Sequence, residues 1–218
     1  ARLTLSSRET GDRFGTSVAV SGDYVIVGAP TDDVLATDEG SVHIYERSAS
    51  GVWTAKPRLL ASDARIYNNF GQSVSISGDY AAVGAYSGGS GTARTGSAYL
   101  FQRDSLGTWS EIDTVFASDG ADNDEFGYAI GISGQSVVVG APEHAPGSDT
   151  TGSAYLYEPS GAPTWTESAK LLAVNGADLD DFGAAVAIHG AYAIVGAYRA
   201  DPDGLSGAGS VTIFAVEQ

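Results

Sequence analysis

The chain contains no cysteine and no methionine among its 218 residues, and it has only 11 lysines and arginines against 27 aspartates and glutamates. Without cysteine the fold has no disulfide to rely on. The net charge of −16 argues against nucleic acid or an anionic membrane as a partner, because phosphate binding depends on clustered basic residues. No apolar run approaches the roughly 20 residues of a membrane span. We expect a soluble, exported protein, secreted or held at the cell surface. The absence of methionine even at position 1 suggests a processed N-terminus or a piece of a longer protein.

A short motif recurs four times at a constant spacing of 56 residues. Phe-Gly is followed fourteen residues later by Gly-Ala and then proline or tyrosine. The Phe-Gly pairs are Phe14-Gly15, Phe70-Gly71, Phe126-Gly127 and Phe182-Gly183, and the second motif begins at Gly28, Gly84, Gly140 and Gly196. Self-similarity at a fixed period predicts a repeat architecture.

Each repeat has the pattern of four short strands. In the first repeat, residues 17–20 alternate small or polar with apolar side chains, and residues 24–27 form a β-branched run. Residues 41–45 and 53–61 give the third and fourth strands. Four antiparallel strands separated by turn residues and repeated along the chain are typical of β-propeller blades. No segment has a helical apolar period, so the predicted fold class is all-β.

The two ends of the chain predict how the ring closes. The fourth repeat stops before a fourth strand, whereas residues 2–6 lie one period before the similar segment 58–62. We therefore expect the N-terminal strand to complete the last blade and to remove the free sheet edge. The prediction is a single four-bladed domain over residues 1–218, with repeats at about 7–62, 63–118, 119–174 and 175–218 plus 1–6. A monomer is favoured, and the alternatives are an eight-bladed ring of two chains and a fragment of a longer propeller.

The repeated segments resemble a known family. Residues 12–30, 68–86, 124–142 and 180–198 are similar to FG-GAP repeats, the propeller units of integrin alpha subunits and of many bacterial extracellular proteins. The resemblance covers nearly the whole chain and implies the propeller fold. It also implies a calcium loop of the type DxDxDG between the first two strands of some blades. Here those positions hold short turns such as Ser21-Gly22-Asp23 and Ser133-Gly134-Gln135, which are too short to surround Ca²⁺.

Acidic residues concentrate at one predicted face of the propeller. That face carries the loops between the second and third strands and the loops between blades. It receives 18 of the 27 acids: Glu9, Asp12, Asp32, Asp33, Asp38, Glu39, Asp63, Asp119, Asp122, Asp124, Glu125, Glu143, Asp149, Asp178, Asp180, Asp181, Asp201 and Asp203. Variable loops on a rigid scaffold commonly carry binding sites, so we predict that this face is the working one.

Two of the loops between blades have the oxygen pattern that suits calcium. Hard carboxylate ligands at alternate positions of a glycine-containing loop favour Ca²⁺ over a transition metal. The predicted ligands are Asp119, Asp122 and Asp124 in one loop and Asp178 and Asp180 in the other. The alternative is a solvated turn in which aspartate caps its own backbone amides.

The candidate ligand-binding residues also lie on this face. They are Asp32, Asp33, Asp38, Tyr86, His144 and Tyr198. Tyr86 and Tyr198 occupy equivalent positions two repeats apart and could stack on a sugar or line the central channel. His144 stands beside Glu143, but no nucleophile motif, phosphate loop or zinc signature accompanies it. We predict no catalytic residues.

Three functions are compatible with this pattern. The first is a non-catalytic extracellular recognition or adhesion module that binds a protein at the cell surface or in the matrix through its acidic loops. The second is a lectin with several similar weak sites around the ring. The third is a polysaccharide-processing enzyme, which the dispersed arrangement of the acids disfavours because catalysis needs one converging cluster.

Overall fold

The computed structural model describes residues 1–5, 9–88, 94–147, 149–161 and 163–216, and their regular structure is β-strand apart from one 3₁₀ turn, η1 (Pro202–Gly204). The strands form four antiparallel sheets. The first sheet contains β1 (Ser17–Ser21), β2 (Tyr24–Ala29), β3 (Ser41–Arg47) and β4 (Trp53–Ala55); the second, β5 (Ser73–Ser77), β6 (Tyr80–Ala85), β7 (Ser97–Arg103) and β8 (Trp109–Val115); the third, β9 (Ala129–Ser133), β10 (Ser136–Ala141), β11 (Ser153–Gly161) and β12 (Thr164–Leu171); and the fourth, β13 (Phe182–His189), β14 (Tyr192–Ala197) and β15 (Ser210–Ala215).

Each sheet is a meander in chain order, as the repeat pattern predicts. The first two strands are joined by a two-residue turn, because Ser21 pairs with Tyr24 across Gly22 and Asp23. Gly22 has a φ of 55°, a conformation that an L side chain rarely adopts. The same turn recurs in the other three sheets with Gly78, Gly134 and Gly190, each at positive φ. These turns are as short as the sequence predicts.

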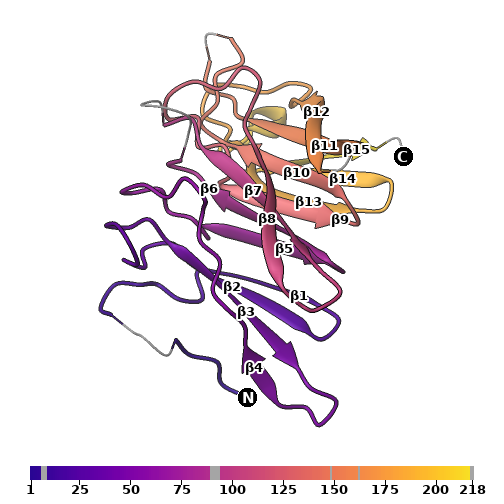
Figure 1. Cartoon of the computed structure of the whole chain (residues 1–218). Coiled ribbons are helices and arrows are strands. Elements are labelled where there is room, and N and C mark those ends of the chain that lie inside the picture. The colour runs from indigo at the N-terminus through magenta and orange to yellow at the C-terminus, as the bar shows by residue number, and fades with distance from the viewer. Residues whose placement is uncertain (6–8, 89–93, 148, 162, 217–218) are drawn as a thin grey trace.

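The four sheets follow one another in chain order as stacked layers (Figure 1). The first strand of each sheet packs against the first strand of the next, from β1 through β5 and β9 to β13. A serine hydroxyl at the end of one first strand accepts a hydrogen bond from the next turn: Ser21 from the Gly78 N–H at 3.0 Å, and Ser77 from the Gly134 N–H at 2.9 Å. Each sheet therefore makes its main contacts with its direct neighbours.

The phenylalanine of the repeated motif fills the joint between two sheets. Phe70 is fully buried and packs edge-on against Tyr99 and Phe101 of its own sheet, with ring centroids 5.2 and 6.0 Å away. Ile26 and Ile44 of the preceding sheet belong to the same core cluster. Phe126 and Phe182 are buried in the same way, so these three residues share one packing role. Phe14, which has no preceding sheet, is only half-buried.

The glycines of the joint allow two backbones to approach closely. A Cβ atom at Gly28 would overlap the carbonyl oxygen of Gly71. That oxygen also accepts a hydrogen bond from the Ser17 hydroxyl at 2.7 Å. A Cβ atom at Gly84 would likewise overlap the carbonyl oxygen of Gly127, and one at Gly140 would overlap that of Gly183. Glycine recurs at this position because any side chain would force neighbouring sheets apart.

The prediction that the N-terminal strand completes the last blade is wrong in this structure. The fourth sheet has three strands, and β15 pairs only with β14 among the described residues. Residues 1–5 stay beside the first sheet, where the Thr4 carbonyl accepts a hydrogen bond from the Tyr45 hydroxyl at 3.3 Å. Ser6 lies outside the described residues. The first and fourth sheets occupy opposite ends of the row, as do the two termini in Figure 1, so the short segment cannot reach β15.

Candidate functional site

The loops predicted to share one face do meet in the structure. In each of the first three sheets, the loop after the second strand hydrogen bonds with the loop that leads to the next sheet; the Tyr67 N–H donates to the Thr37 carbonyl, and the Leu179 N–H donates to the Thr150 carbonyl, both at 2.8 Å. These loops gather on the left of Figure 1, opposite the short hairpins. We call this side the loop face.

One aspartate of each acidic loop shapes the loop itself. Asp124 accepts a hydrogen bond from the Ala121 N–H at 2.7 Å, and Asp180 accepts one from the Ala177 N–H at the same distance. Asp12 makes the equivalent bond to the Glu9 N–H. All three carboxylates are buried. Two of the predicted metal ligands, Asp124 and Asp180, thus cap backbone amides, which is the alternative that the sequence left open.

His144 connects two of the predicted site residues. Its Nδ1 lies 2.6 Å from Oδ2 of Asp124, and its Nε2 lies 2.8 Å from Nζ of Lys170. Since a lysine ammonium can only donate, Nε2 accepts and Nδ1 donates to Asp124. Nζ of Lys170 also lies 2.5 Å from Oδ2 of Asp119. The Tyr155 hydroxyl donates to the other oxygen of Asp119 at 2.9 Å. These five side chains form a continuous hydrogen-bonded network.

The network changes the acidity of two of its members. Burial opposes ionisation of Asp119, but the hydrogen bonds from Lys170 and Tyr155 outweigh it and lower the pKa of this carboxyl. Burial, followed by the hydrogen bond to Asp119, raises the pKa of Tyr155. Asp119 is therefore held as a carboxylate and Tyr155 as a neutral phenol. Each partner supports the charge state of the other.

The remaining predicted metal ligands link neighbouring loops. Asp122 accepts a hydrogen bond from the Arg94 N–H at 2.9 Å, and Asp178 accepts one from the Thr150 N–H at 2.8 Å. Within the residues that the structure describes, no group of three or more histidine, cysteine, aspartate or glutamate side chains is placed to hold a metal ion. Calcium binding at these two loops therefore stays a prediction.

Two of the three predicted ligand-binding aspartates of the first repeat are engaged within their loop. Asp32 is buried and accepts a hydrogen bond from the Ser41 hydroxyl at 2.5 Å. Asp33 is exposed, and its Oδ1 accepts the Asp38 N–H at 2.6 Å. Asp38 has a φ of 50°, so this bond holds a left-handed turn. Asp33 and Asp38 face solvent at least in part, whereas Asp32 does not.

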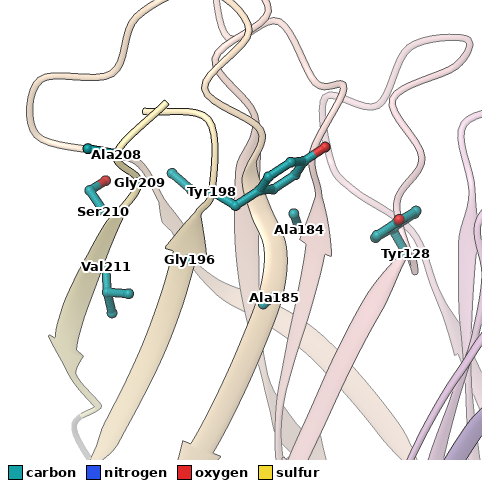
Figure 2. A pocket seen from close by; sticks show the side chains of 10 residues that line it. Tyr128, Ala184, Ala185, Gly196, Tyr198, Ala208, Gly209, Ser210 and Val211 are labelled. Atoms are coloured by element: carbon teal, nitrogen blue, oxygen red, sulfur yellow. The ribbon is translucent and has the colours of Figure 1, made fainter. Parts of the chain in front are cut away.

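The two predicted tyrosines lie near a third tyrosine. Tyr86 packs edge-on against Tyr128 with ring centroids 6.1 Å apart. Tyr128 and Tyr198 line a groove of about 720 Å³ on the fourth sheet, together with Gly196, Gly209 and Val211. Figure 2 shows Tyr198 and Tyr128 on either side of Ala184 at one end of this groove. No repeated pattern marks Tyr128 in the sequence, because the equivalent residues of the other repeats are Thr16, Gln72 and Ala184.

An acidic cluster, defined here as Glu125, Glu143 and Asp181, lies at the seam between the third and fourth sheets. Burial together with the charges of Glu143 and Asp181 raises the pKa of Glu125. Arg199 is the cation paired with the cluster, with Nη1 3.3 Å from Oδ2 of Asp181. A hydrogen bond to Asp181 is the first cause of the raised pKa of Tyr198, so this ring lies at the edge of the cluster.

The sequence places these acids on the loop face but does not distinguish them from the other acids there. Glu125 and Asp181 immediately precede the Phe-Gly pairs of the third and fourth repeats, where the first two repeats have Arg13 and Asn69. All four residues have positive φ, between 52° and 59°. An acid at this one constrained position in adjacent repeats was the signal that could have identified the seam.

The stacked antiparallel meanders and their Phe-Gly joints define a repeat protein of the β-propeller type. The family model described as FG-GAP repeat matches residues 1–45, 53–101, 109–157 and 165–214. The chain belongs to the FG-GAP repeat family. A comparison with curated proteins gave no match. Among the described residues, the structure has no helix with the length and hydrophobicity to cross a membrane.

Proposed function

We propose that this protein is a non-catalytic extracellular recognition module that binds a basic protein partner through the acidic cluster on its loop face. The observation that carries the proposal is the position of Glu125: it is half-buried at the seam, where the charges of Glu143 and Asp181 act on it, and the arginine nearby, Arg199, pairs with Asp181. A cationic side chain placed there would relieve this repulsion. The extracellular role is supported by the resemblance to the repeats of integrin alpha subunits.

The side chains around the cluster suit an ammonium or guanidinium group. Tyr128 and Tyr198 are exposed beside it, and tyrosine faces attract cations. Arg199 already stacks on Tyr198, 5.2 Å from the ring centroid, so this ring is used in that way within the chain. The net charge of −16 would steer a basic partner toward the protein. We expect binding to weaken as salt is added, because exposed charges are screened.

The test is a triple substitution, Glu125→Gln, Glu143→Gln and Asp181→Asn. The probe is an immobilised lysine- and arginine-rich peptide, with an uncharged peptide of the same length as reference. The control variant carries Asp23→Asn, Asp79→Asn and Asp104→Asn, which changes the net charge equally at exposed positions of the hairpins opposite the loop face. Loss of binding in the cluster variant alone supports the proposal. Equal binding by both variants, or an equal loss in both, contradicts it.

A lectin is the second candidate, favoured by the exposed rings of Tyr128 and Tyr198 on the groove of Figure 2. Aromatic faces beside carboxylates can stack on a sugar and accept its hydroxyl groups. A glycan array distinguishes the two functions, because a lectin is saturated by small sugars. Binding to glycans that is lost in Tyr198→Ala, but retained in the triple cluster variant, would favour the lectin.

Calcium is a separate proposal for the loops that carry Asp119, Asp122, Asp124, Asp178 and Asp180. A ligand that binds only the folded state raises the melting temperature. Thermal unfolding should therefore be compared with added Ca²⁺ and with a chelator. An unchanged melting temperature would remove calcium from these loops, and a rise with Ca²⁺ that Asp122→Asn and Asp178→Asn abolish together would support it.

A further inference from the structure

The last sheet presents an apolar face that is covered in the three other sheets. Ile194, Val211 and Ile213 are 39 %, 62 % and 66 % exposed. Their equivalents in the first sheet, Ile26, Val42 and Ile44, are fully buried in the joint with the second sheet. The same three positions are buried in the second and third sheets, where they hold Ala82, Ala98 and Leu100, and Val138, Ala154 and Leu156. The exposed face, which we call the tail face, is thus half of a joint that the chain forms three times.

The first sheet presents the other half. Val18 and Val20 are each 67 % exposed, whereas their equivalents Val74 and Ile76 are 8 % and 7 % exposed. Val74 and Ile76 belong to the core cluster that joins the first two sheets. We call the surface formed by Phe14, Gly15, Val18 and Val20 the head face. The head and tail faces thus occupy the positions of two surfaces that pack against each other in the joints within the chain.

Two glycines of the last sheet, Gly196 and Gly209, also lack the backbone contact that their equivalents make with the next sheet. Gly28, Gly84 and Gly140 each lie against the carbonyl of the next Phe-Gly glycine, but a Cβ at Gly196 would meet only Ala185, 3.6 Å away. Gly209 likewise lacks the phenylalanine backbone that lies against Gly40, Gly96 and Gly152. Gly196 and Gly209 line the groove of Figure 2. This groove is the place that a Phe-Gly turn occupies in the other three joints.

We propose that a second copy of this chain docks head to tail on the fourth sheet, with its Phe14-Gly15 turn seated in the groove. In each of the three joints within the chain, the surface equivalent to the tail face packs against the next sheet. A second copy on the tail face would repeat this established interface. Head-to-tail contacts use two different surfaces, so they form rings or filaments according to whether the rotation closes. Two copies joined in this way at both ends contain eight sheets, within the usual range for a propeller ring.

The N-terminal segment of the second copy would supply the missing strand. In the first sheet, Leu59 pairs with Val42 through both backbone hydrogen bonds, at 2.8 and 3.0 Å. The residue one repeat before Leu59 is Leu3, and the residue equivalent to Val42 in the last sheet is Val211. Residues 2–5 already lie beside the first sheet, since Thr4 accepts the Tyr45 hydroxyl as Phe116 accepts that of Tyr157. In the assembly, Leu3 of one copy pairs with Val211 of the other.

Two positions of the tail face differ from the internal joints. Ala185 replaces the serine that bonds to the next glycine carbonyl, but Ala129 does the same in the joint between the third and fourth sheets. His189 replaces Ser21, Ser77 and Ser133, whose hydroxyls accept the next turn's N–H. The new joint thus has at least one hydrogen bond fewer than the internal ones.

Mass in solution tests the proposal. The intact chain should have at least twice the 22.3 kDa of a single copy by sedimentation or light scattering. Gly196→Ala should reduce this mass to that of one copy with an unchanged circular dichroism spectrum, because the new methyl group has room in the single chain but overlaps an incoming Gly15 carbonyl. Gly147→Ala is the matched control, since its Cβ meets no atom within 4 Å and lies outside both faces.

A mixing experiment establishes the direction of the contact. Val20→Lys places a charge on the head face and should also give single copies. Each variant keeps one intact face, so mixing Gly196→Ala with Val20→Lys should restore a two-copy species, whereas neither forms it alone. Single copies of the unaltered chain at every soluble concentration would overturn the proposal, as would a Gly196→Ala variant with unchanged mass. A two-copy species that does not return on mixing would also overturn it.

Discussion

Asp124 accepts a hydrogen bond from His144, with 2.6 Å between Oδ2 and Nδ1, and both side chains are buried. His144→Ala leaves this carboxylate with one fewer donor in a place that water cannot fill freely. A buried polar group that loses its partner typically costs about 1–3 kcal/mol. Urea unfolding should show a loss of this order. Leu106→Ala, on an exposed hairpin, is the control, and an equal loss there would contradict the structural role of His144.

Asp119 should make part of the stability depend on acid. Its pKa is lowered in the folded protein despite partial burial, since Lys170 and Tyr155 stabilise the carboxylate. A group with a depressed folded-state pKa contributes its stability above its unfolded pKa, here 3.8, and loses it as the pH falls through the lower folded value. Asp119→Asn should therefore be less stable than the unaltered chain at neutral pH. The difference should shrink below pH 3.8, as melting temperatures across this range would show.

The phenylalanines of the repeats should contribute unequally to the free energy of unfolding, according to whether they lie in a joint between two sheets. Phe126 is fully buried in a joint, and replacing such a residue by alanine costs about 3–5 kcal/mol. Phe14 is half-buried, with edge-on contacts to His43 and Tyr45. Phe14→Ala should cost distinctly less in denaturant unfolding at low protein concentration. A larger loss at Phe14 than at Phe126 would contradict the joint described here.

Gly140 should tolerate no side chain. A Cβ there would overlap the carbonyl group of Gly183 and force the third and fourth sheets apart. Overpacking of this kind costs roughly 1–3 kcal/mol, and more where backbone must move. Gly140→Ala should lower the melting temperature by several degrees, whereas Gly147→Ala should leave it within error. Equal melting temperatures for the two variants would show that the sheets adjust freely.

Most of the fold could be predicted from the sequence because each structural requirement recurs in every repeat. The four copies of Phe-Gly and Gly-Ala established the period, and the turns at Gly22 and Gly78 separated the strands. The closure of the ring could not be predicted in this way. Residues 2–6 match the fourth-strand segments of other repeats, but a match in sequence does not say which sheet the segment can reach. In the structure, the distance between the N-terminal segment and β15, rather than the residue types of the segment, determines which sheet the segment lies beside.

The candidate site was predictable at the level of the face and not of the contacts. Counting acids identified the loop face, but Asp124 and Asp180 proved to cap their own loops. The link from His144 to Asp119 passes through Lys170, whose equivalents are Arg2, Arg58 and Thr114; a basic residue recurs at this position, but its recurrence does not indicate which side chains it contacts. Such contacts depend on which loops meet across a joint, and this is a property of the stacked sheets.

The restriction of contacts to adjacent sheets has a consequence for how the protein opens. The second and third sheets have a neighbour on both sides, whereas the first and fourth have one each. In such linear arrays the stability of each unit depends on its nearest neighbours. Local unfolding should therefore begin at the two ends of a single chain and proceed inward. Amide protons of β6 and β10 would exchange last with solvent, and those of β1 and β15 first.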